Sequence, residues 1–423
     1  MRQEYQKTIL NNGMRLITSP MPHTRSVSIN FFIGTGSRYE KDAQAGISHF
    51  IEHMCFKGTD TRPNAGEIAA AIEGVGGILN AATDKELTVY WCKVAEPHFL
   101  FALSVMTDLL LNSQFAPDEI EKERQVIVEE INMTDDSPSQ RSAMLIDELL
   151  WPGHPLGRDI AGTRKSVSAI SREMMLAYMK EQYQAAATVI SIAGDIQHEA
   201  TVNAVTQALS GWNNGRAHPA YLPYTAQTGQ QVKIETRETE QTHLCLAMPG
   251  LPLLHPRRHA LDLLNIILGE GMSSRLFTEI RDNLGLAYNI NSYVDHFLDT
   301  GSLIITAGVD KDSLTTAIKA ILEELSKLKG AIGEEEIHKA KEYAKGRILL
   351  RMESSHNVAG WLGAQEVLTG RIRNVDQVIE IIDAVTAEEL RQLATELLRG
   401  EQLRLAVVGP VSPDTPLKEL LKL

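Results

Sequence analysis

Gly46-Ile47-Ser48-His49-Phe50-Ile51-Glu52-His53-Met54 is the segment around which the rest of this 423-residue chain can be interpreted. It contains no Pro and, after Gly46, no Gly, so we expect it to form a helix. His49 and His53 are four residues apart, which places both imidazoles on one helical face, one turn apart. Two nitrogens placed in this way can share one metal ion. Glu52 stands beside that face, where its carboxylate can reach a metal-bound water without being a ligand.

The order His-x-x-Glu-His is the inverse of the commoner zinc-peptidase order, and its chemistry is understood. Zn²⁺ lowers the pKa of bound water toward about 7, and the glutamate takes the water's proton during attack on a peptide carbonyl. The alternative is a pair of ordinary surface or core histidines. The chain has 13 histidines, so this pattern arises by chance in roughly a few per cent of such chains. The motif therefore needs support from elsewhere in the sequence.

The composition narrows the classes of partner. The formal charge of −13 argues against nucleic acid or an anionic membrane as a partner. No apolar run approaches 18 residues, so we expect no membrane span. The first seven residues, Met1-Arg2-Gln3-Glu4-Tyr5-Gln6-Lys7, do not resemble a signal peptide. Cys55, Cys92 and Cys245 are odd in number and widely spaced, which is typical of free thiols, and we expect a cytoplasmic protein.

The pattern of expected helices and strands occurs twice along the chain. The helix containing Ile120 has a counterpart containing Ile337, and the strand ending at Gly194 has a counterpart ending at Gly409, at offsets of 217 and 215 residues. Similar offsets at two places indicate a duplicated domain. In the second copy the segment opposite the two histidines is close to 263–267, which has no metal ligands. One half therefore carries the metal and the other half has another role.

A catalytic zinc needs three protein ligands and one open position. The acidic segment Asp118–Met133, expected to be a helix, offers Glu123 and Glu130 on one face and Glu129 beside it. In the repeat alignment Glu123 and Glu130 fall on Ala340 and Arg347, so the half without histidines lacks both acids. A solvated acidic helix face is the alternative explanation of these residues.

Several motifs in register resemble the pitrilysin-type inverzincin zinc metallopeptidases, in the branch of mitochondrial processing peptidase and its bacterial relatives. They are His49–Met54, then Phe56-Lys57-Gly58-Thr59, and then Gly76-Gly77-Ile78-Leu79-Asn80-Ala81. The resemblance covers nearly the whole chain. Seventy-six residues lie between His53 and Glu130, which places Glu130 at the position of the family's third ligand. The resemblance thus implies one Zn²⁺ per chain on His49, His53 and Glu130, with Glu123 orienting a ligand.

Two further sites are implied by the same resemblance. Asn80 and Ala81 match an exposed edge strand to which an extended peptide substrate adds by backbone hydrogen bonds. Arg281 and Tyr288 match an arginine–tyrosine pair that contacts the substrate carbonyl and the developing oxyanion. The segment 269–271 departs from the family because it carries fewer glycines than is common there.

The expected fold is α+β, with two structurally similar duplicated domains, each a mostly antiparallel sheet with helices packed on one side. We place the catalytic domain at 1–212, a linker at 213–228 and the ligand-free domain at 229–423. The expected function is a zinc metalloendopeptidase, a homodimer that hydrolyses unfolded peptides or presequences in a closed chamber, with Glu52 as general base. Two alternatives stay open: a non-catalytic structural or partner subunit, and an enzyme active only with a different partner chain.

Overall fold

The computed structural model describes residues 5–212, 215, 220–226, 229–330 and 332–423. Its chain forms two compact units, which are assembled from alternating segments of the sequence. The first unit contains Met1–Ile131, Asp159–Leu222 and Leu349–Val375, and the second contains Asn132–Arg158, Pro223–Ile348 and Asp376–Leu423. Residues 213, 214, 216–219, 227 and 228 of the expected linker lie outside the described residues.

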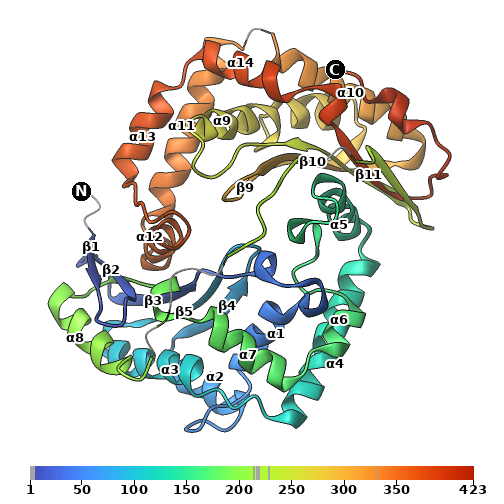
Figure 1. The fold of residues 1–423 in the computed structure, drawn as a ribbon. Coiled ribbons are helices and arrows are strands. Elements are labelled where there is room, and N and C mark those ends of the chain that lie inside the picture. Colours follow the sequence, from blue (N-terminus) through green and yellow to red (C-terminus); the bar gives the residue numbers. More distant parts are fainter. Residues whose placement is uncertain (1–4, 213–214, 216–219, 227–228, 331) are drawn as a thin grey trace. The chain divides into compact units, whose positions relative to one another are not determined.

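Each unit is built on one mixed sheet (Figure 1). The first sheet has the order β1-β2-β6-β3-β5-β4, with parallel pairing only between β2 and β6. Its strands are β1 (Gln6–Ile9), β2 (Arg15–Pro20), β3 (Ser26–Ile33), β4 (Ile78–Thr83), β5 (Thr88–Ala95) and β6 (Thr188–Gly194). The second sheet has the order β7-β11-β8-β10-β9. Its strands are β7 (Val232–Thr236), β8 (Gln241–Pro249), β9 (Ala287–His296), β10 (Gly301–Asp310) and β11 (Arg404–Gly409).

The two sheets have the same topology. The order β2-β6-β3-β5-β4 corresponds strand by strand to β7-β11-β8-β10-β9. In both, the first pair is parallel and the next three pairs are antiparallel. The duplication predicted from the sequence offsets is therefore confirmed, and the hairpin strand β1 is an addition to the first copy.

The helices expected at 46–54 and 118–133 form as α1 and α4, with ends within a few residues of those expected. Ser137 caps α5 by accepting a hydrogen bond from the backbone N–H of Gln140, with Pro138 at the first helical position. The first unit contains α1 (Ile47–Cys55), α2 (Ala65–Glu73), α3 (Phe99–Leu111), most of α4 (Pro117–Asp136), α6 (Arg164–Ala169), α7 (Arg172–Gln182), α8 (His198–Ala208) and α12 (Ser355–Thr369). The second contains α5 (Pro138–Leu150), α9 (Arg258–Gly269), α10 (Leu314–Leu328), most of α11 (Glu334–Arg351), α13 (Val375–Ala384) and α14 (Ala387–Leu397).

The segment 232–248 forms two separate strands. β7 ends at Thr236 and β8 begins at Gln241, so residues 237–240 separate the two strands. Both strands pair with β11, but on its opposite sides, β7 parallel and β8 antiparallel. A single continuous strand cannot occupy both sides of β11, so the chain leaves the sheet between them.

One face of the first sheet carries the main core of that unit. Alternate residues of β3, including Val27, Ile29 and Phe31, are buried in a cluster with residues of α1, α3 and α7. The opposite residues of β3 and β6, such as Phe32 and Val189, pack against α12 in a second cluster. Gly363 of α12 lies so close to Phe32 that a Cβ there would be 2.2 Å from the ring. All seven residues of β6 are buried, as expected for a strand covered on both faces.

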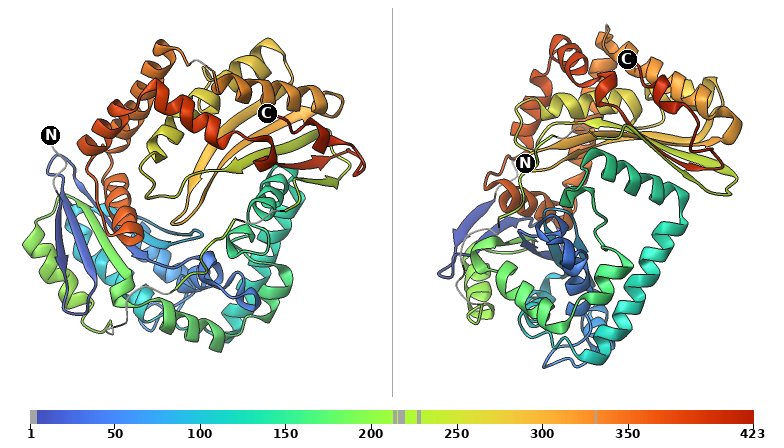
Figure 2. Two further views of the ribbon diagram at one scale, coloured as in Figure 1. Left: turned by 45° about the horizontal axis from the view of Figure 1, so that its top comes forward. Right: turned by 45° about the vertical axis from the view of Figure 1, so that its right-hand side comes forward.

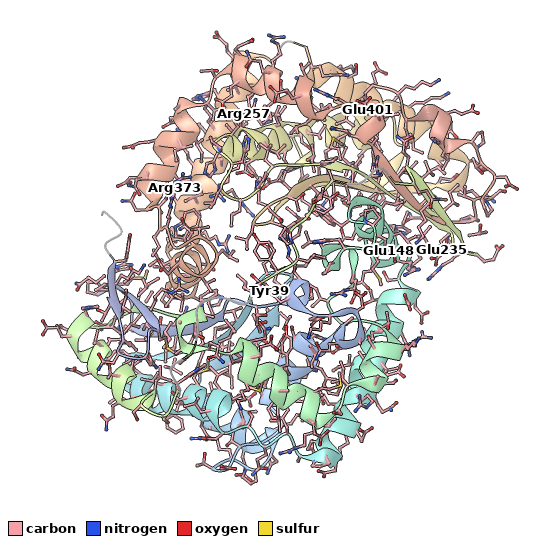
Figure 3. The ribbon with its side chains drawn as sticks, in the orientation of Figure 1. Tyr39, Glu148, Glu235, Arg257, Arg373 and Glu401 are labelled. Atoms are coloured by element: carbon pink, nitrogen blue, oxygen red, sulfur yellow. The ribbon has the colours of Figure 1, made fainter. Side chains whose placement is uncertain are left out.

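The second sheet is covered in the same way. Leu145 and Ile146 of α5 pack with Cys245, Ile304 and Ala406 of the strands. Figure 3 labels Glu148 of α5 and Glu235 of β7. Glu148 forms an ion pair with Lys233. Glu235 forms one with Arg141, whose Nε lies 2.8 Å from Oε2 of Glu235. The right-hand view of Figure 2 shows α5 on one face of this sheet and the C-terminal helices on the other.

Two helices are therefore exchanged between the sequence halves. α5 comes from the first half and covers the second sheet, whereas α12 comes from the second half and covers the first sheet. The expectation of helices on one side only is wrong for this reason, since apolar residues on both faces of the central strands have to be buried. The boundaries 1–212 and 229–423 separate the two sheets but not these two helices. Among the described residues no helix is long and apolar enough to cross a membrane.

Candidate metal centre

Helix α1 begins at a position that requires glycine. Gly46 has φ +93°, and a Cβ there would lie 2.4 Å from the carbonyl oxygen of Ala161. The apolar face of α1 is buried in the core, with Phe50 and Met54 fully inaccessible. This packing leaves the other face, with its two histidines and Glu52, half-buried at the edge of the core.

Helix α4 brings the third residue to this face. The Nε2 atoms of His49 and His53 lie 3.1 Å apart, and each is 3.7 Å from Oε2 of Glu130. One ligand atom from each residue fits within 4.8 Å of the other two, and among the described residues this is the one group of three such side chains. The structure thus brings together the three residues predicted as metal ligands. Glu129, the neighbour considered beside Glu130, is exposed and outside the group.

The arrangement of donor atoms fits a zinc ion. Two nitrogens bound to one tetrahedral zinc lie about 3.3 Å apart, close to the separation of the two imidazoles. Nδ1 of His53 lies 2.7 Å from Oε1 of Glu123. A carboxylate only accepts, so Nδ1 carries the hydrogen and Nε2 directs its lone pair into the group. Nε2 of His53 can therefore share a metal ion with Nε2 of His49 or, without metal, accept a hydrogen bond from it.

The two imidazoles have different electrostatic environments. Burial, assisted by the neighbouring His53, lowers the pKa of His49 to about 4, so this ring is neutral at neutral pH, as a metal ligand must be. Burial also lowers the pKa of His53, but the hydrogen bond to Glu123 and the nearby carboxylates outweigh it, and the net shift is upward. Nδ1 of His49 is buried and has no hydrogen-bond partner among the described residues. Only one of the two rings is therefore oriented by a side chain.

Glu123 is held from two sides. Besides accepting from His53, it forms an ion pair through Oε2 with Nζ of Lys57. Burial tends to raise the pKa of Glu123, but these two hydrogen bonds outweigh burial and lower it, so the carboxylate stays ionised. Lys57 has no place among the predicted site residues. Helical spacing could not have indicated it, because α1 ends at Cys55 and Lys57 lies in the loop that follows.

Glu52 lies outside the ligand group and has its own partner. Oγ1 of Thr83, the last residue of β4, donates to Oε2 of Glu52. Burial raises the pKa of Glu52, although the hydrogen bonds from Thr83 act in the opposite direction. A carboxylate with a raised pKa next to a metal-ligand group is suited to accept a proton. Thr83 was not predicted as a site residue, and no spacing rule relates it to Glu52.

The predicted substrate-binding residues lie on a sheet edge. β4 is the last strand of the first sheet and pairs only with β5 among the named strands. Asn80 is exposed and Ala81 is half-buried, and Oδ1 of Asn80 accepts from the backbone N–H of Ala81. The backbone of β4 is thus open on one side, as strand addition requires.

Arg281 and Tyr288 lie together in the second unit. Arg281 belongs to a π-helical segment, η6 (Phe277–Asn283), and its Cζ is 5.2 Å from the ring centroid of Tyr288 in β9. The guanidinium also lies 4.6 Å from the ring of Phe277. Tyr288 is 78% exposed, so its hydroxyl is available to a ligand. The structure brings the two residues predicted as a pair into contact.

Comparison with known proteins agrees with this geometry. Residues 15–164 match the model "Insulinase (Peptidase family M16)", and residues 169–343 match "Peptidase M16 inactive domain". A Bacillus subtilis protein named "Uncharacterized zinc protease YmxG" is 36% identical over 94% of this chain and 97% of its own. A Mycobacterium leprae protein named "Uncharacterized zinc protease ML0855" is 36% identical over 99% of this chain and 94% of its own. The chain belongs to peptidase family M16.

Solved structures of less similar sequence show the same fold. A protease from Helicobacter pylori superposes with a TM-score of 0.90 at 23% identity, covering 97% of this chain and all of the other. A chain of complex III₂ from Candida albicans superposes with a TM-score of 0.85 at 18% identity, covering 99% of this chain and all of the other. In this M16 chain the three potential ligands lie within the part that matches the insulinase model.

Proposed function

We propose that this M16 protein is a zinc-dependent endopeptidase that hydrolyses internal bonds of unfolded peptides or presequences. The observation that carries the proposal is the division of roles on α1 and α4. His49, His53 and Glu130 form a compact ligand group. Glu52 lies beside them with its carboxylate bonded to another residue, Thr83. A metal site with three protein ligands leaves a position for water, and a separate carboxylate nearby supplies a base.

Each side chain then has a defined task. His49, His53 and Glu130 would hold the zinc ion, which would supply Lewis-acid activation of the attacking water. Glu52 accepts the proton of that water as it attacks the peptide carbonyl, and afterwards delivers it to the leaving amine. Glu123 keeps His53 in the tautomer whose Nε2 binds metal, and Lys57 keeps Glu123 ionised.

The open edge of β4 provides a place for the substrate. An extended peptide adds to this edge by backbone hydrogen bonds, which gives affinity with little demand on sequence. Asn80 and Ala81 belong to this edge. Arg281 and Tyr288 contact the substrate carbonyl and the developing oxyanion, a role supported by their contact with each other and by the exposure of Tyr288.

A homodimer that encloses the substrate in a chamber is part of the proposal. Both the ligand group and the Arg281–Tyr288 pair are present on one chain, so two identical chains suffice for two complete sites. Cys55, Cys92 and Cys245 are free and buried, which favours a reducing compartment such as the cytoplasm.

The alternative is a non-catalytic partner subunit of a processing-peptidase-like complex. The match of one segment to the "inactive domain" model and the fold shared with a complex III₂ chain make it worth testing. The complete set of ligands and the presence of Glu52 favour the enzyme, since a structural subunit has no need of them.

Digestion of a peptide library by the purified protein, read by mass spectrometry, tests the proposal. We expect internal cleavage that disappears after treatment with a zinc chelator and returns when zinc is restored. Light scattering of the same preparation determines the oligomeric state. Tight zinc binding without cleavage of any peptide would instead support the partner-subunit alternative.

A further inference from the structure

The hydrogen bond from Thr83 to Glu52 joins the edge strand to the proposed base. Helix α1 packs against β4, and Thr83 is the last residue of that strand. Its Oγ1 donates to Oε2 of Glu52, and both side chains are half-buried. The two residues are 31 positions apart, so only the packing of α1 on β4 brings them together.

Threonine is suited to hold a carboxylate in one orientation. Its branched Cβ restricts χ1 to few rotamers, so the hydroxyl position is set by the strand backbone. A hydroxyl has one hydrogen to donate. When that hydrogen is given to Oε2 of Glu52, rotation of the carboxylate is restrained and Oε1 is directed to its own fixed position.

We propose that Thr83 is a positioning residue, which restrains the carboxylate of Glu52 so that Oε1 faces the attacking water. This inference rests on the proposed function and deepens it. It identifies which oxygen of Glu52 takes the proton and assigns its orientation to a residue outside the metal-ligand helix.

Thr83 lies on the same strand to which the peptide substrate is proposed to add. Ile78 to Thr83 form the strand on which the peptide is proposed to add, and the same strand ends in the residue that orients the base. A peptide that pairs correctly with β4 therefore lies alongside the strand whose last residue bonds to Glu52. The strand proposed to bind the peptide thus also carries the residue that orients the base, which helps to keep the reacting carbonyl and the base in register.

The test compares three variants of the zinc-loaded protein on one peptide substrate. Thr83→Val keeps the shape of the side chain and removes the hydroxyl, and Thr83→Ser keeps the hydroxyl. For Thr83→Val we expect kcat to fall about 10- to 100-fold, while KM and the zinc dissociation constant stay within two-fold of wild type. Thr83→Ser should recover most of the loss in kcat.

Thr88→Val is the matched control for strand damage. Thr88 is the register partner of Thr83 in β5, is fully buried, and donates to the backbone carbonyl of Thr35 at 2.9 Å. We expect this variant to lower the melting temperature but to keep kcat. In a Glu52→Gln background, Thr83→Val should change the residual rate no further, because both changes remove the same oriented base.

The possible failures are distinguishable. If wild-type protein shows no zinc-dependent cleavage, both the proposed function and this inference fall. If wild type cleaves peptides and Thr83→Val retains its kcat, the inference alone is overturned. A Thr83→Val variant that loses zinc, or one that is not rescued by serine, also contradicts an orienting role for the hydroxyl.

Discussion

Oε1 of Glu123 lies 2.7 Å from Nδ1 of His53, and the other oxygen of the same carboxylate pairs with Lys57. These contacts orient the ring of His53, one of the three potential metal ligands, through the ring nitrogen that does not face the other two. It ends in a cation that compensates the buried negative charge, since the side chain of Glu123 is only 6% exposed.

Glu123→Gln should therefore weaken zinc binding without abolishing it. An amide can still face His53, but it no longer attracts the hydrogen on Nδ1 as strongly, and we expect a loss of about 10- to 100-fold in zinc affinity or activity. Lys57→Met should have a smaller effect in the same direction. Competition with a chromogenic chelator measures both. Lys122→Met, on the exposed part of α4, is the control. Unchanged zinc affinity in Glu123→Gln would show that the contact is structural only.

Glu52→Gln should retain zinc and lose hydrolysis. Glu52 is bonded to Thr83 and is not a member of the ligand group, so metal content measured by atomic emission should match wild type. Peptide cleavage should fall by about 10²–10⁴, the usual contribution of a general base. Loss of the metal from this variant would mean that Glu52 coordinates it.

Glu130→Gln and Glu129→Gln should differ in their affinity for zinc. Oε2 of Glu130 lies 3.7 Å from both imidazole Nε2 atoms, whereas Glu129 is exposed and outside the group. Replacing a ligand carboxylate by an amide removes its charge, so Glu130→Gln should bind zinc much more weakly. Chelator titration of the two variants side by side gives the answer. Equal affinities would sink the assignment of Glu130.

In metal-free protein, His49 should contribute a loss of stability as the pH falls from about 6.5 to about 4. In this window unfolded His49 binds a proton, whereas the folded ring, whose pKa is lowered to about 4 chiefly by burial, does not. Stability rises with pH wherever the unfolded state holds more protons. The raised pKa of His53 acts with the opposite sign, favouring the folded state at low pH and losing that contribution as the pH rises through its folded value.

Melting temperatures from circular dichroism, recorded in chelator across this pH range, isolate the contribution of His49. His49→Asn has no imidazole at this position, so its melting temperature should fall less steeply between pH 6.5 and 4 than that of wild type. Parallel curves for the two proteins would show that His49 is not desolvated in the folded chain.

Mixed dimers test where the proposed site is completed. If Arg281 and Tyr288 serve the zinc of the partner protomer, Glu52→Gln and Tyr288→Phe should each be nearly inactive alone. Co-expressed, they form mixed dimers in which one site carries both defects and the other carries neither. Random pairing makes about half of the dimers mixed, so activity should recover to roughly a quarter of wild type. Mixed dimers, separated by two affinity tags, that regain nothing would assign the pair to its own protomer.

Much of the metal site is local in sequence and could be predicted from it. The spacing of His49 and His53 places both rings on one face of a helix whatever surrounds that helix. The apolar positions of α1 determine which face is buried, and Gly46 determines where the helix begins. The duplication was also visible, because similar offsets between corresponding elements reflect a repeat of their order, and both sheets indeed have the same topology.

Only the tertiary structure decided which distant residues complete the site. That α5 covers the second sheet and α12 the first depends on how apolar surfaces far apart in the chain are buried, and no local period encodes it. Thr83 reaches Glu52 because β4 packs against α1. Lys57 reaches Glu123 because the folded chain brings α4 beside His53. Helical and strand periods determine the face on which a side chain lies, whereas its partner depends on the packing of whole elements.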